Sequence, residues 1–124
     1  MEEQEMNEAL RKKLLGAGVD LDSALERFMG NEGLYLRFAG RFLEDRNYEE
    51  LLKAMEKGDT KAAFAAAHTL KGVSGNLSFN CLYGRVAAVV EPLRCGDLEA
   101  ARKLLPELSG AFEEIRAVLE ELKI

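Results

Sequence analysis

The chain has a single histidine, His68, and the residues at helical spacing from it are suited to one kind of chemistry. Lys71 follows by three residues, and Gly72 and Gly75 follow by four and seven. Residues at these spacings lie on one face of an α-helix. A neutral imidazole is a nucleophile, and a cation one turn away can stabilise the charge of a phosphoryl group in transfer. The spacing therefore favours phosphoryl transfer on His68, with Lys71 as the stabilising cation.

Other chemistries of histidine fit the sequence poorly. A zinc site needs several ligands, and the chain has one histidine and no cysteine pair near it. Cys81 has no oxyanion-stabilising motif beside it, so a Cys–His hydrolase is not expected. The run Gly72-Val73-Ser74-Gly75 matches neither the Walker nor the dinucleotide-binding pattern. We therefore expect no metal, no cofactor, no ATP site and no complete catalytic apparatus of the chain's own.

A helix over residues 60–79 would position His68. Apolar residues recur there at intervals of three and four, which at about 100° per residue form one stripe, with His68 nearly opposite its centre. The face around His68 would then be exposed, with Gly72 and Gly75 leaving space for the loops of a visiting protein. The predicted docking positions on this face are Lys61, Phe64, Ala65, Gly72 and Gly75. The predicted buried stripe is Ala63, Ala66, Leu70, Val73 and Leu77.

Two plainer interpretations stay open at this point. Interior glycines weaken a helix by about 1 kcal/mol each, so the helix could end at Gly72, with residues 73–76 as a loop. That interpretation treats the in-phase Val73 and Leu77 as coincidence. A lone histidine can also be an ordinary surface residue or a hydrogen-bonded core residue, with no role in chemistry.

The rest of the chain also shows helical spacing, and the sequence predicts an all-α single domain over 1–124. Residues 31–124 would form an antiparallel up-down four-helix bundle, and residues 1–30 would form N-terminal capping helices. We expect Gly58-Asp59 and Gly96-Asp97 to end one helix and cap the next, and Asn31 and Asn80 to act as caps. Pro106 should lie within one bent helix. The predicted segments are 3–15, 21–29, 32–57 (with a break near Asn47 left open), 60–79, 81–95 and 98–122. The other predicted core stripes include Met6/Leu10/Leu14, Tyr35/Phe38/Phe42, Leu51/Met55 and Leu82/Val86/Val89/Leu93.

Composition restricts the partners and the location. The net charge of −5 disfavours binding to nucleic acid or to an anionic membrane, because both favour a basic surface. No apolar run is long enough to span a bilayer, and the N-terminus is acidic where a signal peptide would be basic. Cys81 and Cys95 make no disulfide framework and are expected to fill small core spaces in a reducing compartment. We expect a cytoplasmic monomer.

The segment from Ala67 to Leu77 resembles the signature of histidine-containing phosphotransfer (HPt) domains. It has their His-x-x-Lys-Gly core, followed three positions later by a small residue. Residues 42–45 and 51–59 and the Gly96-Asp97 turn are also similar to the family's usual layout. The resemblance implies a four-helix bundle with an N-terminal cap and a phosphorylated His68. It also implies that Lys71 stabilises the phosphoryl group and that Gly72 and Gly75 allow close approach.

The resemblance also implies the partners. Response-regulator receiver domains would donate and accept the phosphoryl group through an aspartate, with Mg²⁺ on the receiver, and some members receive it from a hybrid histidine kinase. The sequence departs from the family pattern at two positions. Ser78 replaces a common glycine, and Val90 lies where many members place a glutamine or glutamate that orients the imidazole. Glu91, Arg94 and Arg85 are alternative candidates for that role. A second hypothesis is a helical adaptor that binds a receiver or histidine kinase to regulate it, without phosphotransfer. A third is a purely structural bundle.

Overall fold

The computed structural model describes residues 6–122, and these residues are almost entirely helical. Apart from an isolated bridge between Val19 and Phe79, the described part of the chain contains no β-structure. The predicted all-helical class is therefore confirmed. The elements are α1 (Glu8–Gly16), α2 (Leu21–Arg27), α3 (Glu32–Arg41), the 3-10 turn η1 (Phe42–Glu44), α4 (Asn47–Lys57), α5 (Thr60–Asn76), α6 (Asn80–Arg94) and α7 (Leu98–Glu120).

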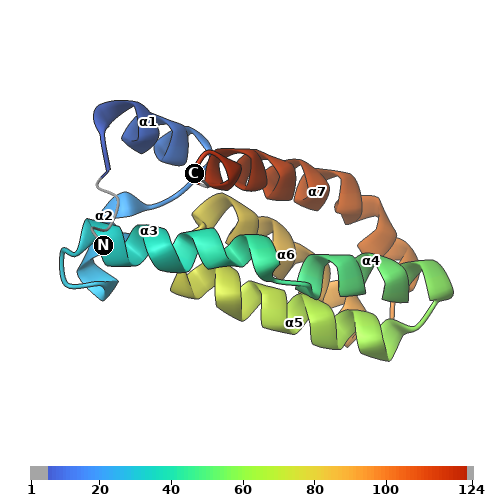
Figure 1. Ribbon diagram of the computed structural model, residues 1–124. Coiled ribbons are helices and arrows are strands. Elements are labelled where there is room, and N and C mark those ends of the chain that lie inside the picture. Colours follow the sequence, from blue (N-terminus) through green and yellow to red (C-terminus); the bar gives the residue numbers. More distant parts are fainter. Residues whose placement is uncertain (1–5, 123–124) are drawn as a thin grey trace.

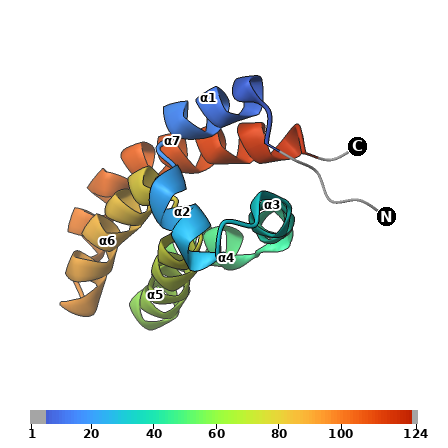
Figure 2. The same ribbon diagram turned by 90° about the vertical axis from the view of Figure 1, so that its left-hand side faces the viewer.

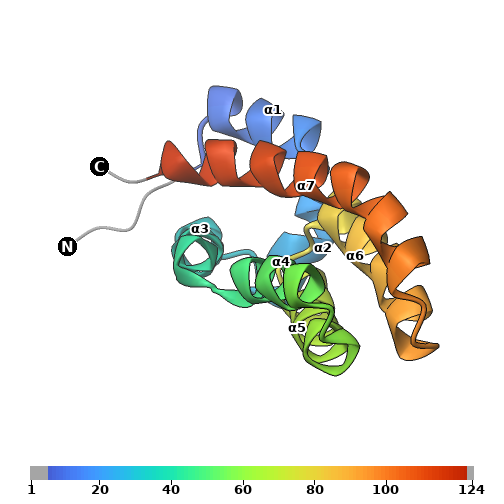
Figure 3. The ribbon, with the colours of Figure 1, turned by 90° about the vertical axis from the view of Figure 1, so that its right-hand side faces the viewer.

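The four C-terminal helices run in alternating directions, and each packs against the next along the chain (Figure 1). Side chains also join the first of these helices to the last: Tyr48 of α4 stacks on Phe112 of α7 and donates a hydrogen bond to Ser109 at 2.7 Å. In Figure 3, where the right-hand side of Figure 1 faces the viewer, α5 lies on the opposite side of the molecule from α7. In Figure 2, α1 lies along α7, and α2 lies near the ends of α5 and α6.

The predicted segment 32–57 is broken, at the point that the sequence left open. Helix α3 ends at Arg41, η1 follows, and α4 begins at Asn47. Asp45 stabilises the new start, because one carboxylate oxygen accepts the backbone N–H of Asn47 at 2.9 Å. The predicted segment 3–15 corresponds to α1, and its residues 3–5 lie outside the described residues.

The turns at Gly58-Asp59 and Gly96-Asp97 follow the predicted pattern. Both glycines are left-handed, with φ of 75° and 77°, and each aspartate accepts the N–H three residues later at 3.0 Å. Helix α7 continues through Pro106 as one helix of 23 residues.

The two asparagines predicted to cap helices behave differently. Asn31 caps α3, because its side chain accepts the N–H of Leu34 at 2.9 Å. The prediction for Asn80 is wrong, because Asn80 is the first residue of α6 and no side chain caps that helix. Its amide instead lies 3.4 Å from a carboxylate oxygen of Asp20, which belongs to the segment before α2.

Helix α5 ends three residues before the predicted end at 79 because the chain turns sharply at Ser78. This buried serine has φ of 59°, a conformation that costs a non-glycine residue energy. The segment before α2 holds the turn. The N–H of Asp20 donates to the carbonyl of Ser78 at 2.9 Å, and the N–H of Cys81 donates to the carbonyl of Gly18 at 3.1 Å. The family's common glycine at this position is therefore replaced by a residue in the backbone conformation that favours glycine.

The core runs along the length of α4 to α7 and extends under α1, α2 and α3. Tyr35 is fully buried within it, and its hydroxyl donates to the carbonyl of Leu77, just after the end of α5, at 2.7 Å. One predicted core residue is misplaced. Phe38 is 40% exposed, because α3 turns this side of the helix outward, where Arg41 covers the ring at 5.1 Å. Neither cysteine is a fully buried core residue, since Cys95 is exposed and Cys81 is half-buried, and both are free thiols.

Within residues 6–122, no helix is both long enough and apolar enough to cross a membrane.

The buried Tyr35 hydroxyl predicts a measurable effect on stability. Tyr35→Phe should lower the free energy of unfolding by about 1–2 kcal/mol, because the carbonyl of Leu77 loses its donor. Tyr83→Phe, which removes a hydroxyl from a side chain that is 39% exposed, should change it by less than about 0.5 kcal/mol. Urea unfolding followed by circular dichroism measures both. Equal stability of Tyr35→Phe and the wild type would contradict the role of this hydrogen bond.

The same residue predicts a pH dependence. Burial raises the pKa of Tyr35 above its ordinary value, because the charged phenolate is poorly solvated in the core. The folded state therefore holds this proton more tightly than the unfolded chain. The resulting stabilisation is complete below about pH 10, the pKa of an unperturbed tyrosine, and is lost as the pH rises above it. The wild type should lose stability more steeply above pH 10 than Tyr35→Phe does.

Candidate functional site

Helix α5 packs between α4 and α6, and the residue types on its buried side permit close contact. Most are small, and Leu70 is the largest that lies within the helix itself. The hydroxyl of Ser74 is buried without a hydrogen-bond partner among the described residues. The hydroxyl therefore makes no bond that would explain a serine here, and we attribute its presence to the small size of the side chain, which allows the neighbouring helices to approach α5. The predicted stripe is buried, except that Val73 is half-buried. The stripe is also wider than predicted, since it includes Ala67 and Ser74.

His68 lies in the middle of α5 on the opposite side and is exposed, as the spacing predicts. The helix continues through Gly72 and Gly75 to Asn76, so the alternative of a helix that ends at Gly72 is wrong. Lys71 is half-buried one turn after His68. The structure thus brings His68, Lys71, Gly72 and Gly75 onto one helical face.

On one side of His68 lies an aromatic residue covered by an arginine. The ring of Phe64, one turn earlier in α5, has its centroid 5.7 Å from that of the imidazole. Phe64 also packs against the edge of the core, and the guanidinium of Arg94 in α6 lies 5.1 Å from its ring centroid. The Phe64 ring therefore contacts both the imidazole and a guanidinium group.

On the other side, Lys71 and Gly75 both contact Tyr83 of α6. The ammonium nitrogen of Lys71 lies 5.9 Å from the Tyr83 ring centroid. A Cβ atom added at Gly75 would lie 3.2 Å from two carbons of the same ring. Gly75 is therefore half-covered by a side chain of this chain. Reasoning from sequence missed Tyr83, because no spacing within the predicted helix over 81–95 distinguishes this aromatic residue from a core residue.

The other predicted docking positions are open, except for Phe64. A Cβ atom added at Gly72 would meet nothing within 4 Å. Lys61 and Ala65 are exposed, and Phe64 is half-buried. That these residues contact a partner stays a prediction.

No hydrogen bond joins the His68 ring to another residue within 6–122. Val90 is fully buried, and its apolar side chain has no group that could form a hydrogen bond with the ring. Of the three alternative candidates, Arg85 donates to Glu107 of α7 at 3.0 Å. Glu91 and Arg94 lie 3.6 Å apart as an ion pair, and Arg94 covers Phe64. Of these three residues, Arg94 is the one that contacts Phe64, and the Phe64 ring in turn lies beside the His68 ring.

The charge of this face differs from that of the whole chain. Helix α5 contains Lys61 and Lys71 and no acidic residue, and Arg94 of α6, which is paired with Glu91, lies over Phe64. The chain as a whole has a net charge of −5. Cations near the imidazole would attract a phosphoryl group and an acidic partner surface. The described residues contain no group of three His, Cys, Asp or Glu side chains that could hold a metal ion.

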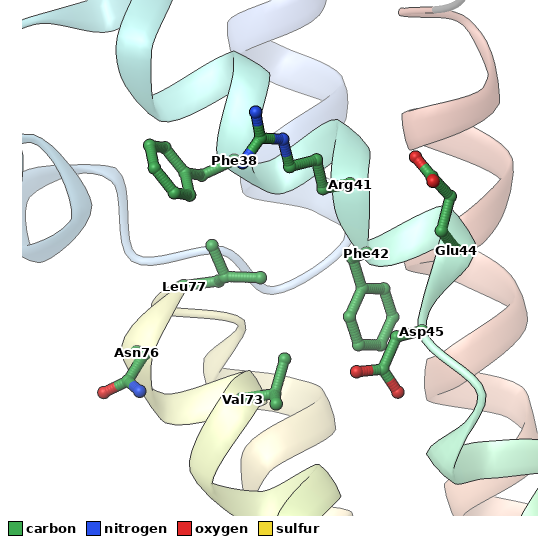
Figure 4. A pocket seen from close by; sticks show the side chains of 8 residues that line it. All are labelled: Phe38, Arg41, Phe42, Glu44, Asp45, Val73, Asn76 and Leu77. Atoms are coloured by element: carbon green, nitrogen blue, oxygen red, sulfur yellow. The ribbon is translucent and has the colours of Figure 1, made fainter.

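A hollow of about 430 Å³ lies beside the C-terminal end of α5 (Figure 4). Val73 of α5 and Leu77, just after its end, face Phe38 and Phe42 across it, and neither His68 nor Lys71 lines it. The hollow is therefore separate from the His68 face.

A comparison with protein-family models identifies the chain. The model described as "Hpt domain" matches residues 43–123, which is more than half of the 124 residues. The chain belongs to the Hpt domain family. No curated protein and no solved structure matches it closely enough to count as a relative.

Membership of the Hpt family places the chain in two-component phosphotransfer. Hpt domains are phosphotransfer carriers rather than complete enzymes, and they interact with receiver domains or kinases in phosphorelays. The matched region begins in η1 and includes α4 to α7, so it contains all the residues of the His68 face. Helices α1, α2 and α3 lie outside it.

The two glycines of this face should respond differently to the same added methyl group. Gly72→Ala should raise the free energy of unfolding by about 1 kcal/mol, because alanine favours a helix and the added Cβ meets open space. Gly75→Ala should gain clearly less, because the Tyr83 ring must move to admit the methyl group. Chemical unfolding of both variants measures the difference. Equal gains would show that the Tyr83 ring does not rest on Gly75 in solution.

Proposed function

We propose that this Hpt domain is a phosphoryl carrier in a two-component phosphorelay, with His68 as the phosphorylated residue. The observation that carries the proposal is the exposed imidazole of His68 at the centre of a basic, sparsely covered face of α5. In this proposal, α3 with α4, then α5, α6 and α7, are the four rods of an antiparallel four-helix bundle. Helices α1 and α2 cap the bundle, and the whole chain is one domain.

The transfer needs only the imidazole and a phosphorylated partner. A lone pair on a ring nitrogen of His68 forms the P–N bond while the P–O bond to the receiver's aspartate breaks, which leaves the carboxylate behind. The other ring nitrogen keeps its proton. Lys71 neutralises charge on the outer phosphoryl oxygens, one turn from the imidazole. The reverse exchange passes the group to a second receiver, and Mg²⁺ belongs to the receiver.

We propose that the partner docks on the open surface around His68. Gly72 is the open position one turn after His68, so a partner loop can reach the helix backbone there. Lys61, Phe64, Ala65 and Gly75 complete the proposed docking surface. We propose receiver domains as the partners, with a hybrid histidine kinase as a further donor. The two free thiols agree with a cytoplasmic location, and we propose a monomer that binds neither nucleic acid nor membrane.

Labelling with phosphorylated receivers tests the proposal. Receiver domains from the same organism, phosphorylated with radioactive phosphate, should transfer an acid-labile, base-stable label to the wild type. His68→Gln should take up none, and its melting temperature should be unchanged because the imidazole is exposed. The proposal fails if the wild type and His68→Gln are equally unlabelled with every receiver. Unchanged binding of a receiver to His68→Ala, together with no labelling of the wild type, would favour the adaptor that binds without phosphotransfer. The His68 ring has no hydrogen-bond partner within residues 6–122, and this observation supports the adaptor as a second candidate function.

A variant at the open glycine tests the docking surface separately. Gly72→Arg should fold normally, because arginine favours a helix and its side chain points into open space. It should weaken binding of the donor receiver at least tenfold, because the long side chain occupies the space that the partner needs. Calorimetric titration measures the affinity, and circular dichroism checks the fold. Unchanged affinity would place the partner elsewhere, and a purely structural bundle would bind no receiver at all.

A further inference from the structure

One side chain of α6 contacts the site without being part of the His68 motif. The Tyr83 ring lies beneath the ammonium group of Lys71, with 5.9 Å between Nζ and the ring centroid. The same ring rests on the backbone of α5 at Gly75, where a Cβ atom would approach Cδ2 and Cε2 to 3.2 Å. Tyr83 is 39% exposed, so one part of the side chain contacts α5 and another faces solvent.

These two contacts have a common geometric cause. Lys71 and Gly75 are four residues apart, so they lie one above the other on the surface of α5. A ring from α6 whose Cδ2–Cε2 edge lies against Gly75 is therefore also close to the side chain of Lys71. A Cβ atom at residue 75 would require the ring to move by a few tenths of an ångström. The glycine thus has a role within the domain, in addition to any role at the partner interface.

The contact matters because lysine is flexible. Its four-carbon stem loses conformational freedom when the ammonium group is held in one place, and this loss opposes any interaction with a phosphoryl group. The negative face of an aromatic ring attracts a cation within about 6 Å of its centroid. A lysine that is already restrained one helical turn from the imidazole has less freedom to lose when the phosphoryl group arrives.

We propose that Tyr83 is a positioning residue that holds the ammonium group of Lys71 ready beside His68, and that Gly75 lacks a side chain so that the Tyr83 ring can lie there. The proposal rests on the proposed phosphotransfer function, but the contact itself can be tested without any phosphotransfer. Tyr83 acts through Lys71 and does not touch the phosphoryl group.

The first test uses NMR of the isotopically labelled full chain. Ring current from Tyr83 should shift the side-chain protons of Lys71 upfield. Tyr83→Phe should keep the shift, and Tyr83→Leu should remove it. Gly75→Ala should reduce it, because the ring is displaced, whereas Gly72→Ala adds the same methyl group in open space and should leave it unchanged. Identical Lys71 shifts in the wild type and in Tyr83→Leu would overturn the proposal, whatever the phosphotransfer assay shows.

The second test measures transfer from a phosphorylated receiver to His68. Tyr83→Leu should slow the transfer about two- to fivefold, the factor that corresponds to a cation–π contact at an exposed site. Tyr83→Phe should restore the rate. Lys71→Ala should slow the transfer more, and adding Tyr83→Leu to it should change nothing further. A purely structural Tyr83 would slow the Lys71→Ala variant as well, and that result would overturn the proposal.

Gly75→Ala completes the test through a double variant. Alone, it should slow the transfer, because the displaced ring no longer restrains Lys71. In the Tyr83→Leu background, the added methyl group should slow the transfer less than in the wild type, since the ring that it displaces is already absent. Equal slowing in both backgrounds would mean that Gly75 acts only through the partner, and the role of Gly75 in the proposal would be wrong. If the wild type accepts no phosphoryl group, the phosphorelay function fails while the NMR result still decides whether Tyr83 holds Lys71.

Discussion

The close packing of α5 between α4 and α6 is the interaction on which the rest of the structure depends. Small buried residues such as Ala63, Ala67 and Ser74 let both neighbours approach the α5 backbone. Because the neighbouring helices and the core occupy the other sides of α5, one strip of its surface stays uncovered, and His68 lies in the middle of that strip. The exposure of the imidazole therefore follows from burial on the other side of the helix and needs no special loop or strained conformation.

Rigidity and access make opposite demands on the exposed side of α5. Two interior glycines weaken the helix by about 2 kcal/mol in total relative to alanine, yet α5 passes through both. Burial of Leu70 and its neighbours on the opposite side offsets this cost. The two glycines have different surroundings, since Gly72 adjoins open space and Gly75 adjoins the aromatic ring of Tyr83. Gly72 thus leaves the α5 backbone open to solvent, whereas Gly75 allows the Tyr83 ring to pack against it.

The sequence predicted the His68 face because periodicity within one helix determines which residues share a side. What it could not predict arises between helices or from the path of the backbone. Tyr83 reaches Gly75 only through the way α6 lies against α5, which no spacing within either helix encodes. Ser78 turns the chain in a conformation that its residue type disfavours, so α5 ends earlier than periodicity indicates. Phe38 is in phase with its neighbours but lies exposed at the edge of a hollow, because α3 turns this side of the helix outward.

The strand-like contact between Val19 and Phe79 has a consequence for where this domain begins. The Hpt match starts at residue 43, but backbone hydrogen bonds with residues 18–20 and the hydroxyl of Tyr35 hold the turn that ends α5. A fragment cut at the family boundary would leave that turn without these partners and would expose the strained Ser78 to water. Contacts that hold the end of α5 thus extend beyond the region that the family model matches. Residues 18–20 and Tyr35, which precede the matched region, therefore stabilise the end of the helix that carries His68.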